Sequence, residues 1–385
     1  MTKVKLAIVN NFLPPYRVPV FDHFASDPDF ETRAFLLGTK QQMRTIWGLD
    51  GSGTRKNVVQ LPGVGIKIRD RSADRIFFNP GFSRITSWNP DAVLIFGNRD
   101  ITIWMVALVC RLRRIPYVLV VDTTSGGGRS MSGRFSLPIM RALISSASYL
   151  VPSSKTAQEF LLANGGSADR CKIVPIVPDV RLFEVSERMH AIAGSVREEL
   201  GFQGKTVVFF VGRLVREKGV RELIEAIDVV SKANDNVEFL IVGDGPLRSD
   251  VEEFCKSHPE AVRYMGLVDD ETLYRLFGIA DIHVMPSYAE AFGVVCTEAM
   301  AFGVPSIVTS TSGCADLIVD GESGRLIRPR DASDLAKAIL EMASDRTRLG
   351  AMKARAFKIA KGTTSEDVQR ELKSIILEVA NRRAE

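Results

Sequence analysis

The chain has 385 residues, of which 45% are hydrophobic and 25% are charged, and its formal net charge at pH 7 is +4. This composition is that of a globular protein, and the length is sufficient for two hydrophobic cores. Its five scattered cysteines do not form a disulfide framework or a metal-ligand pattern, and its most apolar run, residues 101–110, is too short to span a membrane.

Apolar, β-rich runs alternate with helix-like stretches along the chain. The runs cover residues 4–9, 92–96, 117–121, 207–211, 239–242 and 282–285. This alternation predicts an α/β fold with doubly wound parallel sheets wrapped by helices. Ligands bind such sheets at the carboxyl ends of the strands, so we expect the functional residues in the loops that follow them. The first strand begins too early to leave room for a signal peptide, and we therefore expect a protein that is not exported.

The loop after the first strand carries two prolines, Pro14 and Pro15, followed by Tyr16 and Arg17. The prolines stiffen the loop, which makes Tyr16 and Arg17 candidates for contacting a ligand. The alternative is that Tyr16 is a core residue and Arg17 its salt-bridged neighbour. The loop contains no G-x-G-x-x-G sequence, and this counts against a dinucleotide-binding dehydrogenase.

Asp122 follows the predicted strand 117–121. A carboxylate at a strand end can accept hydrogen bonds from hydroxyl groups or stabilise positive charge. The alternative is that Asp122 caps the turn that follows it.

Charge is divided unevenly along the chain. Residues 1–185 contain 24 Lys and Arg against 14 Asp and Glu, whereas the remainder contains 26 against 32. Two basic clusters stand out, Lys67 with Arg69, Arg71 and Arg75, and Arg111 with Arg113 and Arg114. Such clusters suit an anionic membrane surface or a phosphorylated lipid, and the alternative is an ordinary solvated face.

A second group of strand ends carries cations and glycines. Gly212, Arg213 and Lys218 follow the predicted strand 207–211, and fixed cations there would stabilise negative charge on a phosphate. Taken alone, they also fit a solvated basic turn. A short strand from residue 262 ends at a group of three residues, Gly266, Leu267 and Val268.

Two glutamates eight residues apart, Glu290 and Glu298, are the most informative pair in the chain. Residues 287–293 have the composition of a loop and residues 294–302 that of a helix, which Gly303 and Pro305 end. The turn of Ala291, Phe292, Gly293 and Val294 therefore lies at a helix N-terminus, where unpaired N–H groups and the helix dipole favour a diphosphate.

The segments from residue 205 to residue 327 together resemble the donor-binding half of retaining GT-B glycosyltransferases of family 4, of the bacterial polysaccharide and glycolipid type. The resemblance implies two Rossmann-like domains that face each other across a cleft where donor and acceptor meet. It implies a hexosyltransferase that moves a sugar from a nucleoside-diphosphate sugar to a hydroxyl of a glycan or lipid-linked acceptor, with retention and without a metal or other cofactor.

The resemblance also implies roles for individual residues. Arg213 and Lys218 would stabilise the leaving diphosphate, Glu298 would hold the ribose, and Glu290 would position the transferred sugar. The remaining donor contacts would be Gly212, Gly266, Leu267, Val268, Ala291, Phe292, Gly293 and Val294. Tyr16 and Arg17 stand in a loop variant without the family's usual Gly-Gly pair, and Asp122 stands where many members have a His that contacts the sugar.

We expect residues 1–185 to form the acceptor domain, residues 186–362 the donor domain, and residues 363–385 a helix that returns to the first domain. The expected location is cytoplasmic, with peripheral attachment to the inner face of a membrane, and nucleic acid is not an expected partner. The sequence Asp27-Pro28-Asp29 matches a metal-binding D-x-D, but it lies in a loop after a helix-like segment, and we discount it. The competing functions are a sugar-nucleotide epimerase on a similar fold and a nucleotide-binding protein without transferase activity.

Overall fold

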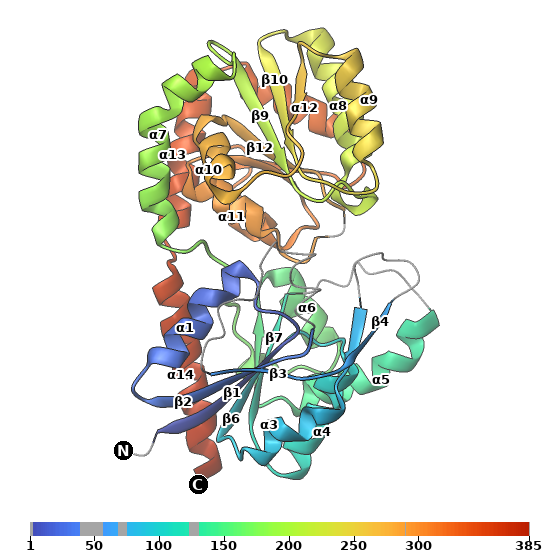
Figure 1. Cartoon of the computed structure of the whole chain (residues 1–385), viewed down its shortest axis with the longest axis vertical. Helices are drawn as coiled ribbons and strands as arrows, with labels where there is room; N and C mark the ends of the chain where they lie inside the picture. The colour runs from blue at the N-terminus through green and yellow to red at the C-terminus, as the bar shows by residue number, and fades with distance from the viewer. Residues whose placement is uncertain (1–2, 39–56, 68–74, 123–130, 289, 385) are drawn as a thin grey trace. The chain divides into compact units, whose positions relative to one another are not determined.

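The computed structural model describes residues 3–38, 57–67, 75–122, 131–288 and 290–384. The chain forms two compact units, one of residues 1–175 with 365–385 and the other of residues 176–364. Each unit has one six-stranded parallel sheet with helices on both faces (Figure 1). The predicted α/β class with two doubly wound, Rossmann-like units is thereby confirmed.

The sheet of the first unit has the strand order β3-β2-β1-β6-β7-β8. Its strands are β1 (Val4–Asn10), β2 (Phe30–Leu36), β3 (Val58–Gln60), β6 (Ala92–Phe96), β7 (Tyr117–Val121) and β8 (Tyr149–Pro152). The helices are α1 (Val18–Ser26), α3 (Ser83–Ser87), α4 (Ile101–Leu112), α5 (Met131–Ser146), α6 (Lys155–Ala163) and α14 (Ser365–Ala384). A separate antiparallel hairpin joins β4 (Val64–Lys67) and β5 (Arg75–Phe78).

The two faces of this sheet are covered by different helices. Alternate residues of the strands, among them Val9, Val93 and Leu119, share one core with buried residues of α4, α5 and α6. Helix α14 packs on β6, β7 and α1. In the middle of α14, Lys373 pairs with Asp27 and Asp29, each at 2.7 Å.

The sheet of the second unit has the order β11-β10-β9-β12-β13-β14. Its strands are β9 (Thr206–Val211), β10 (Val237–Val242), β11 (Val262–Tyr264), β12 (Ile282–Met285), β13 (Ser306–Thr309) and β14 (Gly324–Ile327). The helices are α7 (Arg181–Glu199), α8 (Val220–Ala233), α9 (Arg248–Ser257), α10 (Asp270–Ile279), α11 (Val294–Ala301), α12 (Ala332–Ala343) and α13 (Arg346–Lys361).

Helical periodicity explains how these helices pack. In α8, the buried residues are Val220, Leu223, Ala226, Ile227 and Val230, which follow the spacing of one helix face. That face joins the core formed with the strands of the second sheet.

The boundary between the units differs from the predicted one. A boundary after residue 185 would cut helix α7, which instead packs as a whole against α10 of the second unit. Val196 of α7 shares a core with Leu276 and Phe277 of α10. The second unit therefore begins at Ile176, before the helix, because the apolar side of α7 is buried there.

Candidate functional site

The candidate donor site of the second unit is built around the carboxyl end of β12. Two helices begin beside this strand end, and both are preceded by a glycine with a left-handed backbone, Gly219 (φ 70°) before α8 and Gly293 (φ 100°) before α11. A Cβ atom on Gly219 would lie 2.2 Å from the carbonyl oxygen of Pro286, and one on Gly293 would lie 2.6 Å from Cε of Met285. Glycine is therefore favoured at both positions by backbone angle, and at Gly219 it is also required by space, because the clash there is with backbone.

This close packing brings together two of the predicted catalytic residues. Lys218 precedes Gly219, Glu290 lies in the loop before α11, and their side chains form an ion pair. Both side chains are largely buried, with 23% of Lys218 and 14% of Glu290 exposed. Two groups that are 72 residues apart in sequence are thus in direct contact, each neutralising the other.

Arg213, the other predicted cation, lies on the loop that follows β9 and is exposed. Its backbone carbonyl accepts a hydrogen bond from Val215 N–H at 2.9 Å, and Leu214 beside it is fully buried. In the described part of the chain, its guanidinium takes part in no ion pair. It is therefore available to an anionic ligand.

Glycines also join the carboxyl ends of β9, β10 and β11. Gly243 N–H donates to Gly266 O at 2.8 Å, and Gly212 N–H donates to Val242 O at 3.0 Å. A Cβ atom on Gly243 would lie 1.8 Å from Gly212 O, so the loops after β9 and β10 are in backbone contact. Leu267, beyond Gly266, is 76% exposed. Val268 is partly buried and packs against the core of α7 and α10.

The turn in front of α11 presents backbone rather than side chains. Ala291 is exposed, Phe292 is 3% exposed, and no side chain caps the N-terminus of α11. Phe292 O accepts a hydrogen bond from Cys314 N–H at 2.7 Å, which fixes the turn from behind. The first turn of α11, beginning at Val294, can therefore offer N–H groups to an anion.

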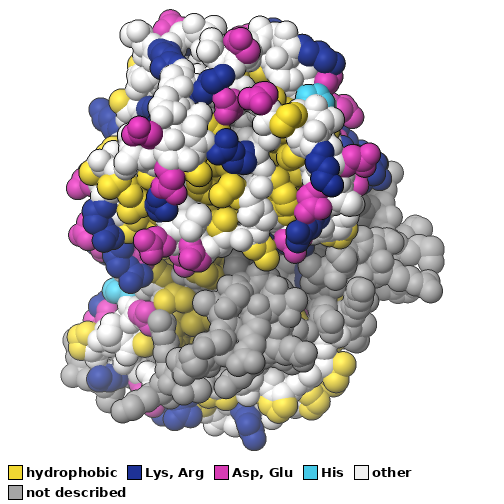
Figure 2. All heavy atoms as spheres, turned by 45° about the horizontal axis from the view of Figure 1, so that its top comes forward, with side chains coloured by type: hydrophobic (Ala, Val, Ile, Leu, Met, Phe, Trp, Pro, Cys, Tyr) yellow, Lys and Arg dark blue, Asp and Glu magenta, His cyan; other side chains and the backbone are white. Residues whose placement is uncertain are grey.

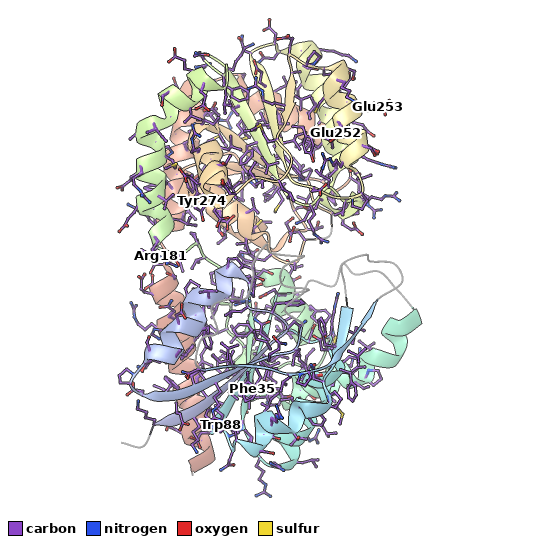
Figure 3. All side chains as sticks on the ribbon, in the orientation of Figure 1. Phe35, Trp88, Arg181, Glu252, Glu253 and Tyr274 are labelled. Atoms are coloured by element: carbon purple, nitrogen blue, oxygen red, sulfur yellow. The ribbon has the colours of Figure 1, made fainter. Side chains whose placement is uncertain are left out.

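Glu298 lies one turn into α11 and is partly buried. Burial, together with the nearby carboxylate of Asp270, raises the pKa of Glu298 to about 7. Tyr274 of α10, labelled in Figure 3, interacts electrostatically with Glu298, and its ring stacks on Phe302 with the centroids 5.8 Å apart. A carboxyl group in this setting can both accept and donate hydrogen bonds, as recognition of a vicinal diol requires.

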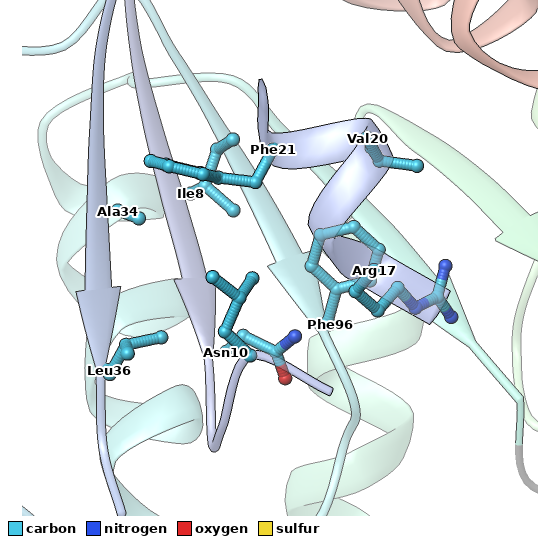
Figure 4. Close-up of a pocket in the computed structure, with 9 residues that line it drawn as sticks. Ile8, Asn10, Arg17, Val20, Phe21, Ala34, Leu36 and Phe96 are labelled. Atoms are coloured by element: carbon cyan, nitrogen blue, oxygen red, sulfur yellow. The ribbon is translucent and has the colours of Figure 1, made fainter. Parts of the chain in front are cut away.

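The candidate residues of the first unit form a second group. Arg17 is 8% exposed, and one of its nitrogens donates to both carboxylate oxygens of Asp122, at 2.8 and 2.6 Å. The guanidinium lies over the ring of Phe96 at 4.4 Å and near that of Tyr16 at 5.4 Å. Figure 4 shows Arg17 beside Phe96, at the end of an apolar pocket that Ile8 and Ala34 also line.

The Arg17–Asp122 pair connects two departures from the family pattern. One is the loop variant that carries Arg17, and the other is Asp122 in place of the His. Although burial opposes it, the Asp122 carboxylate raises the pKa of Arg17 and keeps the guanidinium charged. The two residues are 105 positions apart and occupy the ends of β7 and of the loop after β1. Asp122 remains 27% exposed, so part of its carboxylate is still open to a ligand.

Several features of the site were not predicted. Gly313 lies against the turn, because a Cβ atom there would be 2.4 Å from Ala291 O. Asp270 influences Glu298 from the start of α10, and the thiols of Cys296 and Cys314 are buried and interact with each other. Of these features, only Gly313 could have been recognised in the sequence, because it is a glycine. The other contacts depend on tertiary packing.

The structure also accounts for the discounted D-x-D sequence. Asp27 and Asp29 both pair with Lys373 and so serve to attach α14. Within the described ranges, no group of three or more His, Cys, Asp or Glu side chains is placed to hold a metal ion. Arg69 and Arg71 of the first basic cluster lie outside the described residues, as do the side chains of Lys67 and Arg75.

Comparison with known proteins gives matches to both units. Residues 195–359 match the model "Glycosyl transferases group 1", and residues 36–176 match "Glycosyl transferase 4-like domain". An uncharacterized glycosyltransferase of Methanocaldococcus jannaschii, MJ1607, is 33% identical over 152 residues, 39% of each chain. The TuaC protein of Bacillus subtilis, described as a putative teichuronic acid biosynthesis glycosyltransferase, is 31% identical over 60% of this chain and 56% of its own length. The match spans about two fifths of the length of the first curated relatives.

Solved structures share the fold over nearly the whole chain. HepE of Anabaena, crystallised with UDP, has a TM-score of 0.78 at 17% identity and covers 98% of this chain and 100% of its own. The sucrose-phosphate synthase of Thermosynechococcus elongatus has a TM-score of 0.73 at 18% identity, covering 98% and 99%. The chain thus has the GT-B fold, with a glycosyltransferase 4-like domain over residues 36–176 and a glycosyltransferase group 1 domain over residues 195–359.

Proposed function

We propose that the chain is a retaining glycosyltransferase that transfers a sugar from a nucleoside-diphosphate sugar to a hydroxyl group of a glycan or lipid-linked acceptor. The observation that carries the proposal is the grouping at the end of β12 of Lys218, Glu290 and the uncapped N-terminus of α11. A cation, a carboxylate and free N–H groups are what a sugar diphosphate needs. The two domain matches support the same conclusion.

In this mechanism Lys218 and Arg213 stabilise the negative charge that develops on the leaving diphosphate. The N–H groups of α11 bind the phosphates, and Glu298 accepts hydrogen bonds from the ribose hydroxyls. Glu290 holds the hydroxyls of the transferred sugar. The departing diphosphate takes the proton of the acceptor hydroxyl on the same face, which gives retention without a protein base.

The nucleotide part of the proposal is tested by thermal shift with UDP, GDP, ADP, NAD and their sugar conjugates, since a ligand of the folded state raises the melting temperature. We expect a shift with one nucleoside diphosphate that is lost in Arg213→Ala and Lys218→Ala. A shift with NAD alone would instead favour a dehydrogenase. UDP is the first to test, because HepE was crystallised with it.

Retention and metal independence need separate measurements. NMR of the product should show the same anomeric configuration as the donor sugar, and an inverted product would refute the same-face mechanism. Activity should survive removal of divalent cations by EDTA. Sugar nucleotide epimerised in the absence of any acceptor would indicate an epimerase.

The proposal includes polysaccharide or glycolipid assembly, because TuaC and the CapM protein of Staphylococcus aureus, described as a capsular polysaccharide biosynthesis glycosyltransferase, are among the relatives. It also includes a cytoplasmic location, which suits the five free cysteines. No helix of the described residues is long and apolar enough to cross a bilayer. An anionic membrane surface is part of the proposal as a peripheral partner of the first unit.

A further inference from the structure

Helices α4 and α5 expose large apolar side chains on the surface of the first unit. Leu108 and Leu112 of α4 are 50% and 74% exposed, and Ile139 of α5 is 45% exposed. The two leucines are four residues apart, so they lie on one side of the helix. The two helices pack against each other and turn their buried sides to the same core.

Exposed arginines stand close in sequence to these apolar side chains. Arg111 and Arg114 at the end of α4 and Arg141 of α5 are all exposed, and no ion pair involving them occurs among the described residues. We call the surface of Leu108, Leu112, Arg111 and Arg114 the arginine–leucine face. It consists of apolar side chains and unpaired positive charges.

The arginine–leucine face has no acidic residue to balance its charge. The sequences of α3, α4 and α5 contain no Asp or Glu. By contrast, α14 on the other face of the same sheet contains four acids and four arginines or lysines. Lys, Arg, Asp and Glu side chains are also interspersed over the visible face of the second unit (Figure 2). A surface adapted only to water normally carries both signs.

These properties together favour one occupant. Phosphate groups of a bilayer can pair with the arginines while the leucines enter the region of the acyl chains. In a symmetric pair of copies joined through this face, the same arginines would oppose each other without an acid between them. Nucleic acid would leave the leucines exposed. We infer that the arginine–leucine face docks the chain onto an anionic bilayer, with Leu108 and Leu112 inserted.

The biological role of this docking rests on the proposed transfer to a lipid-linked acceptor, which a membrane-bound enzyme could reach. Membrane binding itself can be measured without transfer activity. The full chain is floated with vesicles of phosphatidylcholine alone and of phosphatidylcholine with 30% phosphatidylglycerol, at low and high salt. We expect binding to the anionic vesicles that falls with salt. A charge of this kind contributes about 1 kcal/mol near anionic lipid, so Arg111→Gln with Arg114→Gln should reduce partitioning roughly 25-fold.

The apolar part is tested by Leu108→Ser with Leu112→Ser, which should also reduce partitioning at least tenfold, but at every salt concentration. Arg188→Gln with Lys256→Gln removes the same charge from exposed positions of the second unit and should leave binding unchanged. Val229→Ser, at a residue 49% exposed on α8, is the matched apolar control. Thermal shift with nucleoside diphosphate shows that each variant is folded and that the donor site is intact.

Three results would overturn the inference. Wild-type chain that fails to float with anionic vesicles has no such docking surface. Equal loss of binding in the face variants and in their matched controls would mean that overall charge, not this face, is responsible. A concentration-dependent dimer that the leucine variants convert to a monomer would assign the face to a second copy. A missing nucleotide shift with intact flotation would refute the transferase proposal alone.

Discussion

The contact between Lys218 and Glu290 predicts that Glu290→Gln will bind free nucleoside diphosphate more tightly than the wild type. In the unliganded structure the lysine is paired with the glutamate, and a diphosphate must compete with that carboxylate for it. Substitution by Gln removes the competing charge and also a negative charge beside the phosphates. Affinity for the product should therefore rise although turnover falls.

The size of the effect follows from the exposure of the pair. Two unit charges 4 Å apart interact by about 4 kcal/mol at an effective dielectric constant of 20. The cost of ordering and desolvating the side chains reduces the net value for partly buried pairs to about 1–2 kcal/mol. At 1.4 kcal/mol per tenfold, the dissociation constant should fall roughly 5- to 30-fold.

Isothermal titration with UDP, GDP and ADP measures this change, and steady-state turnover with the corresponding sugar nucleotide measures the loss of rate. Glu341→Gln, which breaks an ion pair with Arg325 elsewhere in the second unit, is the matched control and should leave affinity unchanged. The gain should disappear when Lys218→Met is added. Equal or weaker product binding by Glu290→Gln would show that the pair does not oppose the phosphates.

Three further predictions concern stability, each measured by urea denaturation. The pKa of Glu298 is about 7 in the folded chain and 4.5 in the unfolded chain, so the neutral carboxyl stabilises the fold fully below pH 4.5. This contribution to the free energy of unfolding, about 3 kcal/mol, is lost as pH rises through 7. Glu298→Gln should lack this pH dependence, and parallel pH profiles of the variant and the wild type would refute the prediction. Gly219→Ala should destabilise the chain by about 2 kcal/mol or more, because its Cβ would clash with Pro286 O at a positive φ; a smaller loss would mean that the α8 start can shift. Asp122→Asn should cost about 2 kcal/mol by leaving Arg17 without a counter-charge, and far less when Arg17→Met is also present; additive losses would argue against the pair.

Local patterns in the sequence were sufficient for the α/β class and for the bounds of several strands and of one helix start. Strands such as 92–96 and 282–285 were predicted from apolar runs, and the structure confirms both as parallel strands. The helix start near Val294 was predicted from its composition and is observed there. These features depend on residues that are close together in the chain, so they can be predicted from a single sequence.

The contacts between distant loops could not be predicted in the same way. The Arg17–Asp122 pair and the Lys218–Glu290 pair each join strand ends that meet only after the sheet has formed. An ion pair also leaves no periodic pattern, because each partner reads as an ordinary charged loop residue. The second unit begins at Ile176 and not after residue 185 for a related reason, since a helix assigned by composition does not reveal which core its apolar side joins.

The attachment of α14 to the first unit has a consequence for the order in which the chain matures. The first unit needs residues 365–385, with Lys373 tied to Asp27 and Asp29, whereas the second unit is continuous in sequence. During synthesis the second unit can complete its core before α14 leaves the ribosome, whereas the first unit cannot be completed until α14 is available. A chain that lacks α14 is thus expected to resist protease across residues 176–364 and to be cleaved readily within residues 1–175.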